Sequence, residues 1–294
     1  MPPNRNPSKD DNPSTYVIYA SKKKAELHRL LLQDRMITTA MGGVLPEQTE
    51  PGDFHRVLDV GCGTGGWLLE AAQTYPAMKL VGVDINKQLI AYAQSQSEAQ
   101  GLKDRVEFQM MDVLHELAFP KNSFDLVNLR YGTSYVRTWD WPKLLLEMQQ
   151  VTRPGGMIRV TDCEVVVQST SSALTQFCEM FVRALYRAGH LFTEEGAGLT
   201  NHLAELLTNS WCEEVQTKAY PLEFGAGTPE AQSFVEDMRS VIQTSRPFIQ
   251  KWVGIPKDYD TIYRQACKEM EQPDFHATWP HWTAWGSKPL SMGK

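Results

Sequence analysis

Cysteine is sparse in this sequence, and its distribution limits the protein classes that fit. The five cysteines among 294 residues are Cys62, Cys163, Cys178, Cys212 and Cys267. Their number is odd, they are scattered, and no C-x-x-C pair occurs. A disulfide framework or a zinc site needs cysteines paired at characteristic spacings. The pattern favours reduced thiols in the cytoplasm over either of these, and we expect no metal site.

Long apolar runs and a surplus of positive charge are also lacking. No apolar run approaches the roughly 20 residues that cross a membrane, and the Pro/Asn/Ser-rich start has no signal-peptide core. Residues 1–15 therefore read as a disordered tail. The formal net charge is −6, whereas nucleic-acid binding relies on Lys and Arg that displace counterions from phosphate. We expect neither a nucleic-acid partner nor a membrane association.

A glycine-dense turn between an apolar run and a helix start is the most informative feature present. The segment Val57–Trp67 reads VLDVGCGTGGW: a short strand that leads through the turn into a helix. Glycine is required where the backbone turns sharply and lies against a ligand, because a Cβ would fill the ligand's space. The turn therefore predicts a cofactor site at the end of the strand.

The glycine spacing alone fits two cofactor classes. Gly61, Gly63 and Gly66 match the dinucleotide pattern G-x-G-x-x-G, which is typical of nicotinamide enzymes. The same loop also fits D-x-G-x-G-x-G, which begins at Asp59 and ends at Gly65. A choice between the two patterns needs the residues that follow.

Further strand-like runs follow at the spacing of alternating strands and helices. Lys79–Asp84 ends in a carboxylate, and an acid at this place accepts hydrogen bonds from the ribose of either cofactor class. Arg105–Val113 closes on another acid, Asp112, for which a nicotinamide enzyme has no standing need. Ser123–Arg130 and Arg153–Val160 read as the fourth and fifth strands. This alternation predicts a parallel sheet covered by helices.

Taken in order, these elements resemble the class I S-adenosylmethionine-dependent methyltransferases. The resemblance covers roughly residues 55 to 165 and implies an α/β fold. That fold is a Rossmann-like, doubly wound, mostly parallel sheet of seven strands with a helical cap. It also implies S-adenosyl-L-methionine as the cofactor. The matching features are the loop from Asp59 to Gly65, the acids Asp84 and Asp112, the phrase Phe124–Val127, and Pro154–Gly156 about thirty residues later.

The resemblance also implies roles for particular residues. Asp84 corresponds to the acid that binds the ribose, and Asp112, with Val113 beside it, to the acid that accepts a bond from the adenine amino group. A helix expected from Ser21 to about Met41 would cover the methionine end of the cofactor as a lid. The predicted cofactor-binding residues are Tyr19, Asp59, Gly61, Gly63, Gly65, Asp84, Ile85, Met111, Asp112, Val113 and Asn128.

Three segments indicate a subgroup within this family. Asn128–Gly132, Trp139–Pro142 and Pro154–Gly156 together look like the LaeA-like methyltransferases, many of which are linked to secondary metabolism. The ubiquinone- and menaquinone-type methyltransferases have similar spacing. This implies an enzyme that methylates a small, apolar or aromatic, natural-product-like acceptor at O, N or C. Two alternatives stay open: a regulatory or scaffold protein of this fold that binds S-adenosylmethionine without turnover, and an NAD-dependent oxidoreductase.

Outside the cofactor core, the sequence predicts a lid and a cap. Helices are expected over about 171–188 and about 198–209, and 211–224 reads as a strand. The last strand is expected to begin at His281, because Pro280 interrupts the apolar run before it. The expected regions are a disordered tail (1–15), an N-terminal lid helix region (16–50), the cofactor core (51–170), cap helices (171–210), and C-terminal edge strands (211–294) with helices inserted over 225–272.

No catalytic signature is visible, and methyl transfer does not require one. The sulfonium carries the driving force, so the protein mainly aligns the nucleophile and excludes water. An acceptor such as a phenol would still gain from a base or a hydrogen-bonding group. Tyr131 and Glu164, near strand ends, and His190, in the cap, are candidates for that group, although the catalytic residue stays unassigned. We expect a small-molecule substrate, and a homodimer remains open.

Overall fold

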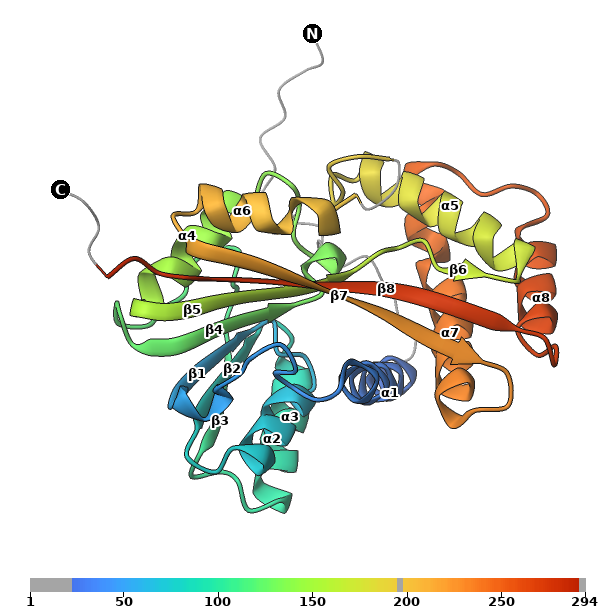
Figure 1. Cartoon of the computed structure of the whole chain (residues 1–294). Coiled ribbons are helices and arrows are strands. Elements are labelled where there is room, and N and C mark those ends of the chain that lie inside the picture. The colour runs from blue at the N-terminus through green and yellow to red at the C-terminus, as the bar shows by residue number, and fades with distance from the viewer. Residues whose placement is uncertain (1–22, 195–197, 291–294) are drawn as a thin grey trace, which may run out of the picture.

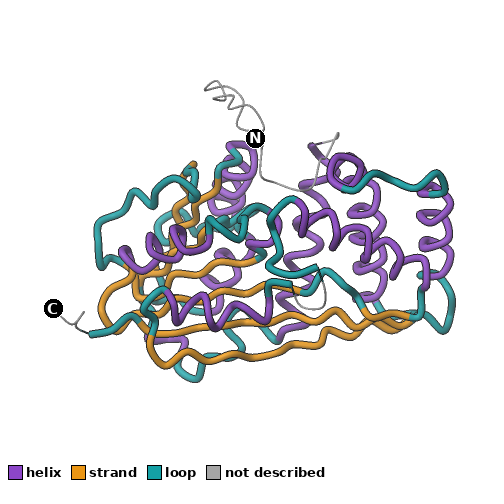
Figure 2. Tube along the Cα trace, turned by 90° about the horizontal axis from the view of Figure 1, so that it is seen from above, coloured by secondary structure: helices purple, strands orange, loops and turns teal. Residues whose placement is uncertain are grey.

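The computed structural model describes residues 23–194 and 198–290. Tyr19 and the tail expected over 1–15 lie outside the described residues. One central sheet carries helices on both of its faces, as Figures 1 and 2 show from two directions. This is the α/β architecture that the alternating pattern predicts.

Five neighbouring strands of the sheet run parallel, in the order β3-β2-β1-β4-β5. β8 pairs antiparallel with β5, and β7 pairs antiparallel with β8. The predicted mostly parallel, Rossmann-like sheet is confirmed. An eighth strand of two residues, β6, also pairs with β8. The strands are β1 (Arg56–Val60), β2 (Lys79–Asp84), β3 (Val106–Met110), β4 (Phe124–Arg130), β5 (Thr152–Cys163), β6 (Gln168–Ser169), β7 (Glu213–Gly225) and β8 (His276–Ser287).

The ends of the helices carry residues that favour those positions. Asn86 caps α3 by accepting bonds from the backbone N–H groups of Gln88 and Leu89. Gly101, just beyond α3, has a positive φ of 68°, and the Thr228 side chain caps α7 in the same way as Asn86 caps α3. The helices are α1 (Lys23–Met41), α2 (Gly66–Thr74), α3 (Lys87–Ala99), α4 (Trp141–Val151), α5 (Ser172–Arg187), α6 (Leu203–Asn209), α7 (Pro229–Trp252) and α8 (Tyr259–Glu269).

Two helices differ from expectation. The helix expected from about Gly198 begins only at Leu203, after a 3-10 turn over Thr200–His202. Neither the turn nor the helix has a side-chain cap at its start, so no local hydrogen bond favours regular helix further back. α4 was not predicted at all. Its sequence carries Pro142 in the first turn, a position that proline tolerates.

The prediction that the last strand begins at His281 is wrong, because β8 begins at His276 and runs through Pro280. Pro280 lies just past the end of β5, where its oxygen accepts a 2.9 Å bond from the Glu164 N–H. Proline has no N–H to return to the Glu164 oxygen. That oxygen instead accepts a 2.8 Å bond from Trp279 Nε1. A side-chain donor thus replaces the missing backbone donor, and the strand continues through the proline.

Both faces of the parallel sheet are buried, as expected for strands between two helix layers. On β1, Val57 packs into one apolar cluster and Leu58 into the other. On β4, Leu126 and Val127 alternate in the same way. All four side chains are fully buried. This packing holds the carboxyl ends of the strands in fixed positions.

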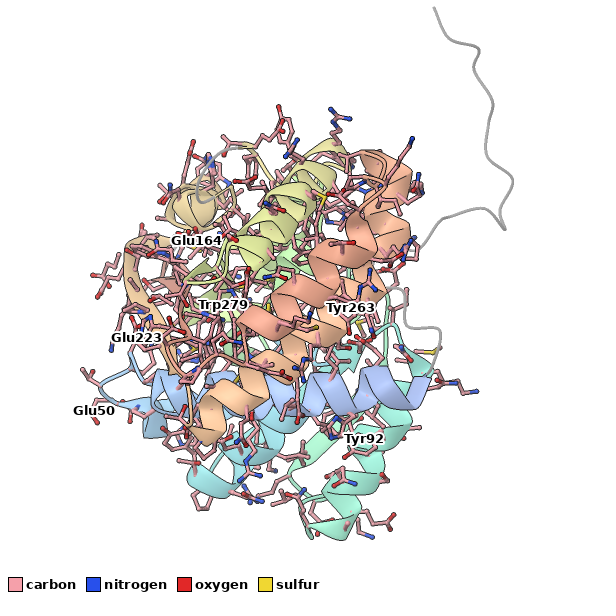
Figure 3. The ribbon with its side chains drawn as sticks, turned by 90° about the vertical axis from the view of Figure 1, so that its right-hand side faces the viewer. Glu50, Tyr92, Glu164, Glu223, Tyr263 and Trp279 are labelled. Atoms are coloured by element: carbon pink, nitrogen blue, oxygen red, sulfur yellow. The ribbon has the colours of Figure 1, made fainter. Side chains whose placement is uncertain are left out.

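β7 and β8 extend beyond the parallel strands, and α5, α7 and α8 gather along that extension (Figure 1). In the side view of Figure 3, α1 runs across the picture behind the end of α7. Arg29 of α1 pairs with Asp237 of α7 at 3.1 Å. Arg130, at the end of β4, pairs with Asp34 of α1. α1 is thereby joined to both the helical group and the sheet.

No helix within residues 23–194 and 198–290 is both long enough and apolar enough to cross a membrane.

Candidate active site

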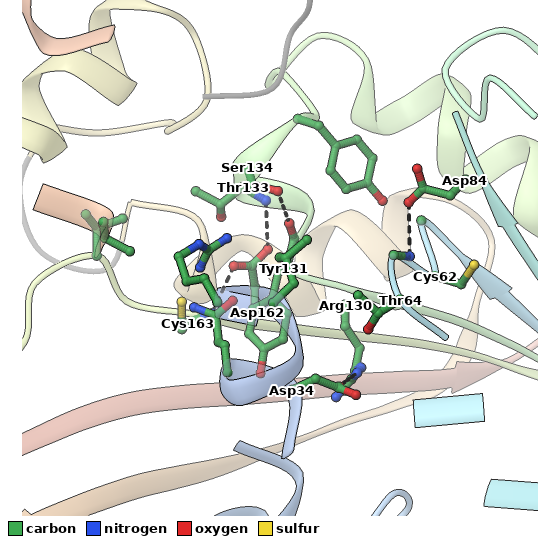
Figure 4. A pocket seen from close by; sticks show the side chains of 18 of the residues that line it. Asp34, Cys62, Thr64, Asp84, Arg130, Tyr131, Thr133, Ser134, Asp162 and Cys163 are labelled. Carbon is green, nitrogen blue, oxygen red and sulfur yellow. Dashed lines mark hydrogen bonds and ion pairs between the residues drawn. The ribbon is translucent and has the colours of Figure 1, made fainter. Parts of the chain in front are cut away.

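A cavity of about 600 Å³ opens at the carboxyl ends of the parallel strands. The glycine loop, several strand ends, α1, α5 and α7 line the cavity. Figure 4 shows Cys62 and Thr64 of the loop, Asp84 and Asp162 at strand ends, and Asp34 of α1. Ligands of open α/β sheets bind at this edge. The volume also falls within the range of small-molecule sites, about 300–1,000 Å³.

The glycine loop forms one wall of the cavity. Gly61, Gly63 and Gly65 have positive φ values of 73°, 55° and 75°. Gly61 and Gly63 line the cavity. A Cβ on Gly63 would meet no protein atom within 4 Å, so the backbone there faces space that a ligand can fill. Gly65 lies outside the lining. A Cβ on it would come within 2.6 Å of the Phe108 ring, so this glycine allows α2 to pack against the sheet.

Two carboxylates at strand ends keep hydrogen-bonding capacity for a ligand. Asp84 accepts bonds from the N–H groups of Gly63, at 3.0 Å, and Asn86, at 2.7 Å. Asp112 accepts a 3.1 Å bond from the Leu114 N–H. An ionised carboxylate has about four acceptor positions, so each acid can accept further bonds. These positions suit ribose hydroxyls and an adenine amino group.

Apolar side chains lie beside Asp112. Ile85 is 65% exposed although it is large and apolar, and it lines the cavity together with Val113. An exposed apolar rim of this kind is a surface that the flat face of a purine can cover. Met111 does not line the cavity. The structure thus brings Ile85, Asp112 and Val113 together and leaves Met111 beside them.

Asp59 lies near the carboxyl end of β1 and lines the cavity. Its side chain is 3% exposed, and its Oδ1 accepts a 2.7 Å bond from Asn128 Nδ2. Burial raises the pKa of Asp59 to about 6, although the Arg130 charge and the Asn128 bond act in the opposite direction. Asn128 itself does not line the cavity. It therefore reaches a ligand only through Asp59.

Arg130 connects the end of β4 to α1, and Tyr131 follows it. Arg130 pairs with Asp34 and donates a 3.2 Å bond from Nη1 to Thr38 Oγ1. Its guanidinium carbon also lies 5.8 Å from the centre of the Trp67 ring. Tyr131 has φ 60° and ψ 44°, a left-handed conformation that costs a non-glycine residue about 1 kcal/mol or more. Backbone strain of this kind clusters at functional sites.

The far end of the cavity is an apolar chamber, which we call the cap chamber. Apolar side chains from α5, α7, β8 and the segment after β5 surround it. It is lined by Val165, Val167, Phe177, Cys178, Phe181, Leu185, Met238, Val241 and Trp279.

Two acids stand where the strand ends meet the cap chamber. Asp162 accepts 2.9 Å bonds from the N–H groups of Thr133 and Cys163, and burial raises its pKa to about 6. Burial also raises the pKa of Glu164, against a hydrogen bond from Trp282 that lowers it. Both acids line the cavity. Their carboxyl oxygens are polar groups at the border of the apolar cap chamber.

Comparison with known proteins agrees with this geometry. Residues 57–156 match the family model described as a methyltransferase domain. Over 107 residues the chain is 37% identical to demethylmenaquinone methyltransferase from Symbiobacterium thermophilum. The aligned segment covers 36% of this chain and 41% of that protein. Over 104 residues the chain is 36% identical to the U6 snRNA (guanine-N(2))-methyltransferase THUMPD2 from Bos taurus. That aligned segment covers 35% of this chain and 21% of that protein.

Residues 57–156 are a class I S-adenosylmethionine-dependent methyltransferase domain. The cofactor of this class is S-adenosylmethionine, and the glycine loop, the two strand-end acids and the apolar rim fit it. The chain spans less than half the length of the two relatives. The solved [4+2]-cyclase SpnF is similar over 93% of this chain and 99% of its own, at a TM-score of 0.53 and 18% identity. That likeness concerns the fold alone.

The three candidate catalytic residues end up in different surroundings. Tyr131 and Glu164 line the cavity. His190 does not: it is 1% exposed and packs against Phe248, with ring centres 6.1 Å apart. Burial lowers the pKa of His190 to about 4. His190 is thus a neutral core residue outside the cavity. The prediction that His190 acts as a base is corrected accordingly.

Sequence reasoning missed several residues that line the cavity. Arg29 and Asp34 reach the cavity from α1, and Phe177 and Met238 reach it from α5 and α7. Helical periodicity marks apolar positions as buried, but it does not separate a core position from a cavity wall. For Arg29 and Asp34, the one available signal was their place on the expected lid helix.

Proposed function

We propose that this chain transfers a methyl group from S-adenosylmethionine to a small, apolar or aromatic molecule, at O, N or C. The supporting observation is one continuous cavity. Asp59, Gly61 and Asp84 line its donor end, and Phe177 and Met238 line the cap chamber at the other. A donor and an acceptor can therefore lie in contact within one cavity. In-line transfer requires that arrangement.

The residues divide the work between binding, alignment and exclusion of water. S-adenosylmethionine supplies an activated methyl group when it is bound. Asp59, Asp84 and Asp112, with the glycine loop, hold the donor. The cap chamber holds the apolar body of the acceptor and keeps water away. Glu164 and Asp162 accept a proton or a hydrogen bond from an acceptor hydroxyl or amine, because burial raises both pKa values.

The donor site is tested by isothermal titration calorimetry of the full chain with S-adenosylmethionine, S-adenosylhomocysteine and NADH. The proposal expects binding of the first two and none of the third. Binding of NADH alone would instead support the NAD-dependent oxidoreductase. No binding of any of the three to folded protein would contradict the proposed cofactor site.

Turnover needs a separate experiment, with methyl-labelled S-adenosylmethionine added to a deproteinised small-molecule extract and, in parallel, to total RNA. Label in an organic-soluble small molecule supports the proposal. Label in RNA would overturn the small-molecule acceptor and the expectation of no nucleic-acid partner. Donor binding without transfer to either pool would favour the regulatory or scaffold protein.

The setting of the enzyme is part of the same proposal. A cytoplasmic location accords with the scattered cysteines, and the expected absence of nucleic-acid and membrane partners accords with the acidic net charge. A role in secondary metabolism rests on the resemblance of Asn128–Gly132, Trp139–Pro142 and Pro154–Gly156 to the LaeA-like methyltransferases. A homodimer is tested by light scattering at micromolar concentrations. The divisions at residues 15, 50, 170 and 210 are tested by limited proteolysis.

A further inference from the structure

A row of buried polar side chains crosses three neighbouring parallel strands in one register. Asp59 of β1 pairs with Asn128 of β4, which pairs with Arg159 of β5. Their exposed fractions are 3%, 0% and 1%. Buried polar groups cost free energy unless they are hydrogen-bonded. These three side chains therefore need hydrogen-bond partners inside the protein.

Hydrogen bonds join the row into a chain that ends at Glu47. Asn128 Nδ2 donates to Asp59 Oδ1 at 2.7 Å, and Arg159 Nη1 donates to Asn128 Oδ1 at 2.8 Å. Arg159 also donates from Nε and Nη2 to the two Glu47 oxygens, at 2.6 and 3.2 Å. The Tyr220 hydroxyl on β7 donates to Glu47 at 3.2 Å. Glu47 belongs to the segment between α1 and β1, and its side chain is fully buried.

The order of donors and acceptors fixes the orientation of the Asn128 amide. Arg159 can only donate, so it holds the Asn128 oxygen toward itself and leaves the amide N–H₂ facing Asp59. A flipped amide would place its oxygen against the Asp59 carboxylate. Burial is the largest single influence on Glu47 and opposes its ionisation, but the Arg159 charge and the hydrogen bonds from Arg159 and Gln48 together outweigh it, and the pKa of Glu47 is lowered. A charged Glu47 in turn makes a buried Arg159 tolerable.

We propose that Arg159 and Glu47 are positioning residues for donor binding, which act through Asn128 to hold the Asp59 carboxylate oriented and ionised for the ammonium group of S-adenosylmethionine. Neither Arg159 nor Glu47 lines the cavity, whereas Asp59 does. An ionised carboxylate binds an ammonium group through a charge-assisted hydrogen bond. The inference rests on the proposed function, because it takes Asp59 as a ligand of the donor.

Other charges also act on Asp59 and have to be held constant. Arg130 from β4 favours its ionised form, and Asp34 from α1 opposes it. Cys62 of the glycine loop and Tyr135, beyond β4, also interact with its charge. All of these groups are the same in the wild type and in Arg159 or Glu47 variants. The difference between pH profiles therefore reports on Arg159 and Glu47.

The test measures the affinity for S-adenosylhomocysteine by calorimetry from pH 5 to 8. An Asp59→Asn variant identifies the part of the wild-type profile that belongs to Asp59. The midpoint of that part is the pH at which half of the Asp59-dependent affinity is lost. Arg159→Met is expected to raise this midpoint by about one pH unit, so that S-adenosylhomocysteine binds about tenfold more weakly at pH values below the wild-type midpoint. Glu47→Gln is expected to move it down, because Arg159 then faces Asp59 without its counter-charge. A general packing defect would instead weaken binding equally at every pH.

Three further variants complete the test. Arg153→Met is the matched control, because Arg153 lies on the same strand and pairs with Asp125 but is 47% exposed; no midpoint shift is expected. Arg159→Lys keeps the charge and should return the midpoint toward the wild-type value. If Arg159→Met does not fold, the doubly neutral Glu47→Gln/Arg159→Met variant replaces it, with a smaller upward shift expected because Asn128 loses its orienting donor.

The possible outcomes separate this inference from the function on which it rests. Wild-type protein that binds S-adenosylhomocysteine, together with Arg159 and Glu47 variants that share its midpoint, would overturn the positioning role alone. Shifts of the same sign in Arg159→Met and Glu47→Gln would also overturn it. Wild-type protein that fails to bind S-adenosylhomocysteine at every pH would overturn the proposed donor site itself.

Discussion

Arg29 Nη1 lies 3.1 Å from Asp237 Oδ1, and this ion pair joins α1 to α7 across 208 positions of the chain. The exposed fractions of the two side chains are 3% and 0%. Gln33, one helical turn after Arg29, donates a 3.0 Å bond to Asp237 Oδ2. Arg29 and Gln33 both line the cavity. α1 is thus fixed to α7 at a place where both helices line the cavity.

Removal of the Asp237 carboxylate should destabilise the protein strongly. Asp237→Ala takes a buried partner from Arg29, and breaking a buried pair costs about 3–5 kcal/mol. We expect the loss of unfolding free energy to lie near the lower end of this range, because Arg29 also pairs with Glu26 at 2.8 Å. The free energy of urea unfolding measures the change. Asp260→Ala is the control, since its pair with Arg246 is exposed and should contribute about 1 kcal/mol or less. Equal losses in the two variants would contradict the prediction.

The strand-end acids should be needed for donor binding. Asp84→Ala and Asp112→Ala each remove acceptors for a ligand, so each should weaken S-adenosylhomocysteine binding about tenfold or more, and the double variant further. Calorimetry measures the affinity, and circular dichroism checks the fold. Asp104→Ala, an exposed acid outside the cavity lining, should bind like the wild type. Unchanged affinity in the double variant would refute the donor site described above.

A methyl group on the glycine loop should block the donor and leave the fold intact. Gly63→Ala puts a Cβ into cavity space at a φ of 55°, so the donor loses room and the backbone is strained by about 1–2 kcal/mol. Gly101→Ala is a matched control with a φ of 68° and no atom within 4 Å, outside the cavity lining. Similar melting temperatures with lost binding only in Gly63→Ala are expected. Normal binding by Gly63→Ala would show that the loop does not contact the donor.

His190 should make stability depend on pH in the acidic range. Its folded-state pKa is about 4, against about 6.5 for an unfolded histidine. Its contribution is therefore fully present above about pH 6.5 and is lost as pH falls toward 4, by up to about 3 kcal/mol. Between pH 7 and 4.5 the wild type should lose more unfolding free energy than a His190→Phe variant. A difference between the two proteins that does not change with pH would contradict this.

The part of the cavity formed by the glycine loop and the strand ends was predictable from the sequence because local rules determine it. A strand, a glycine turn and a helix start can be read from adjacent residues, and Asp84 and Asp112 follow strands that the apolar pattern marks. Gly65 shows the limit of this reading: its spacing fits a ligand contact, whereas its surroundings make it a packing residue. Pro280 shows a second limit. The Trp279 indole replaces its missing donor only because β8 pairs with β5, and the sequence does not reveal that pairing.

The sequence by itself therefore determined the fold class and the kind of methyl donor, since the residues responsible lie within one segment and act through backbone turns and strand ends. Only the tertiary structure decided the rest. The cap chamber combines α5, α7 and β8, and the polar chain from Asp59 to Glu47 passes through β1, β4 and β5. Such sites depend on which buried faces meet, and side chains up to 208 positions apart meet only when the whole chain is packed.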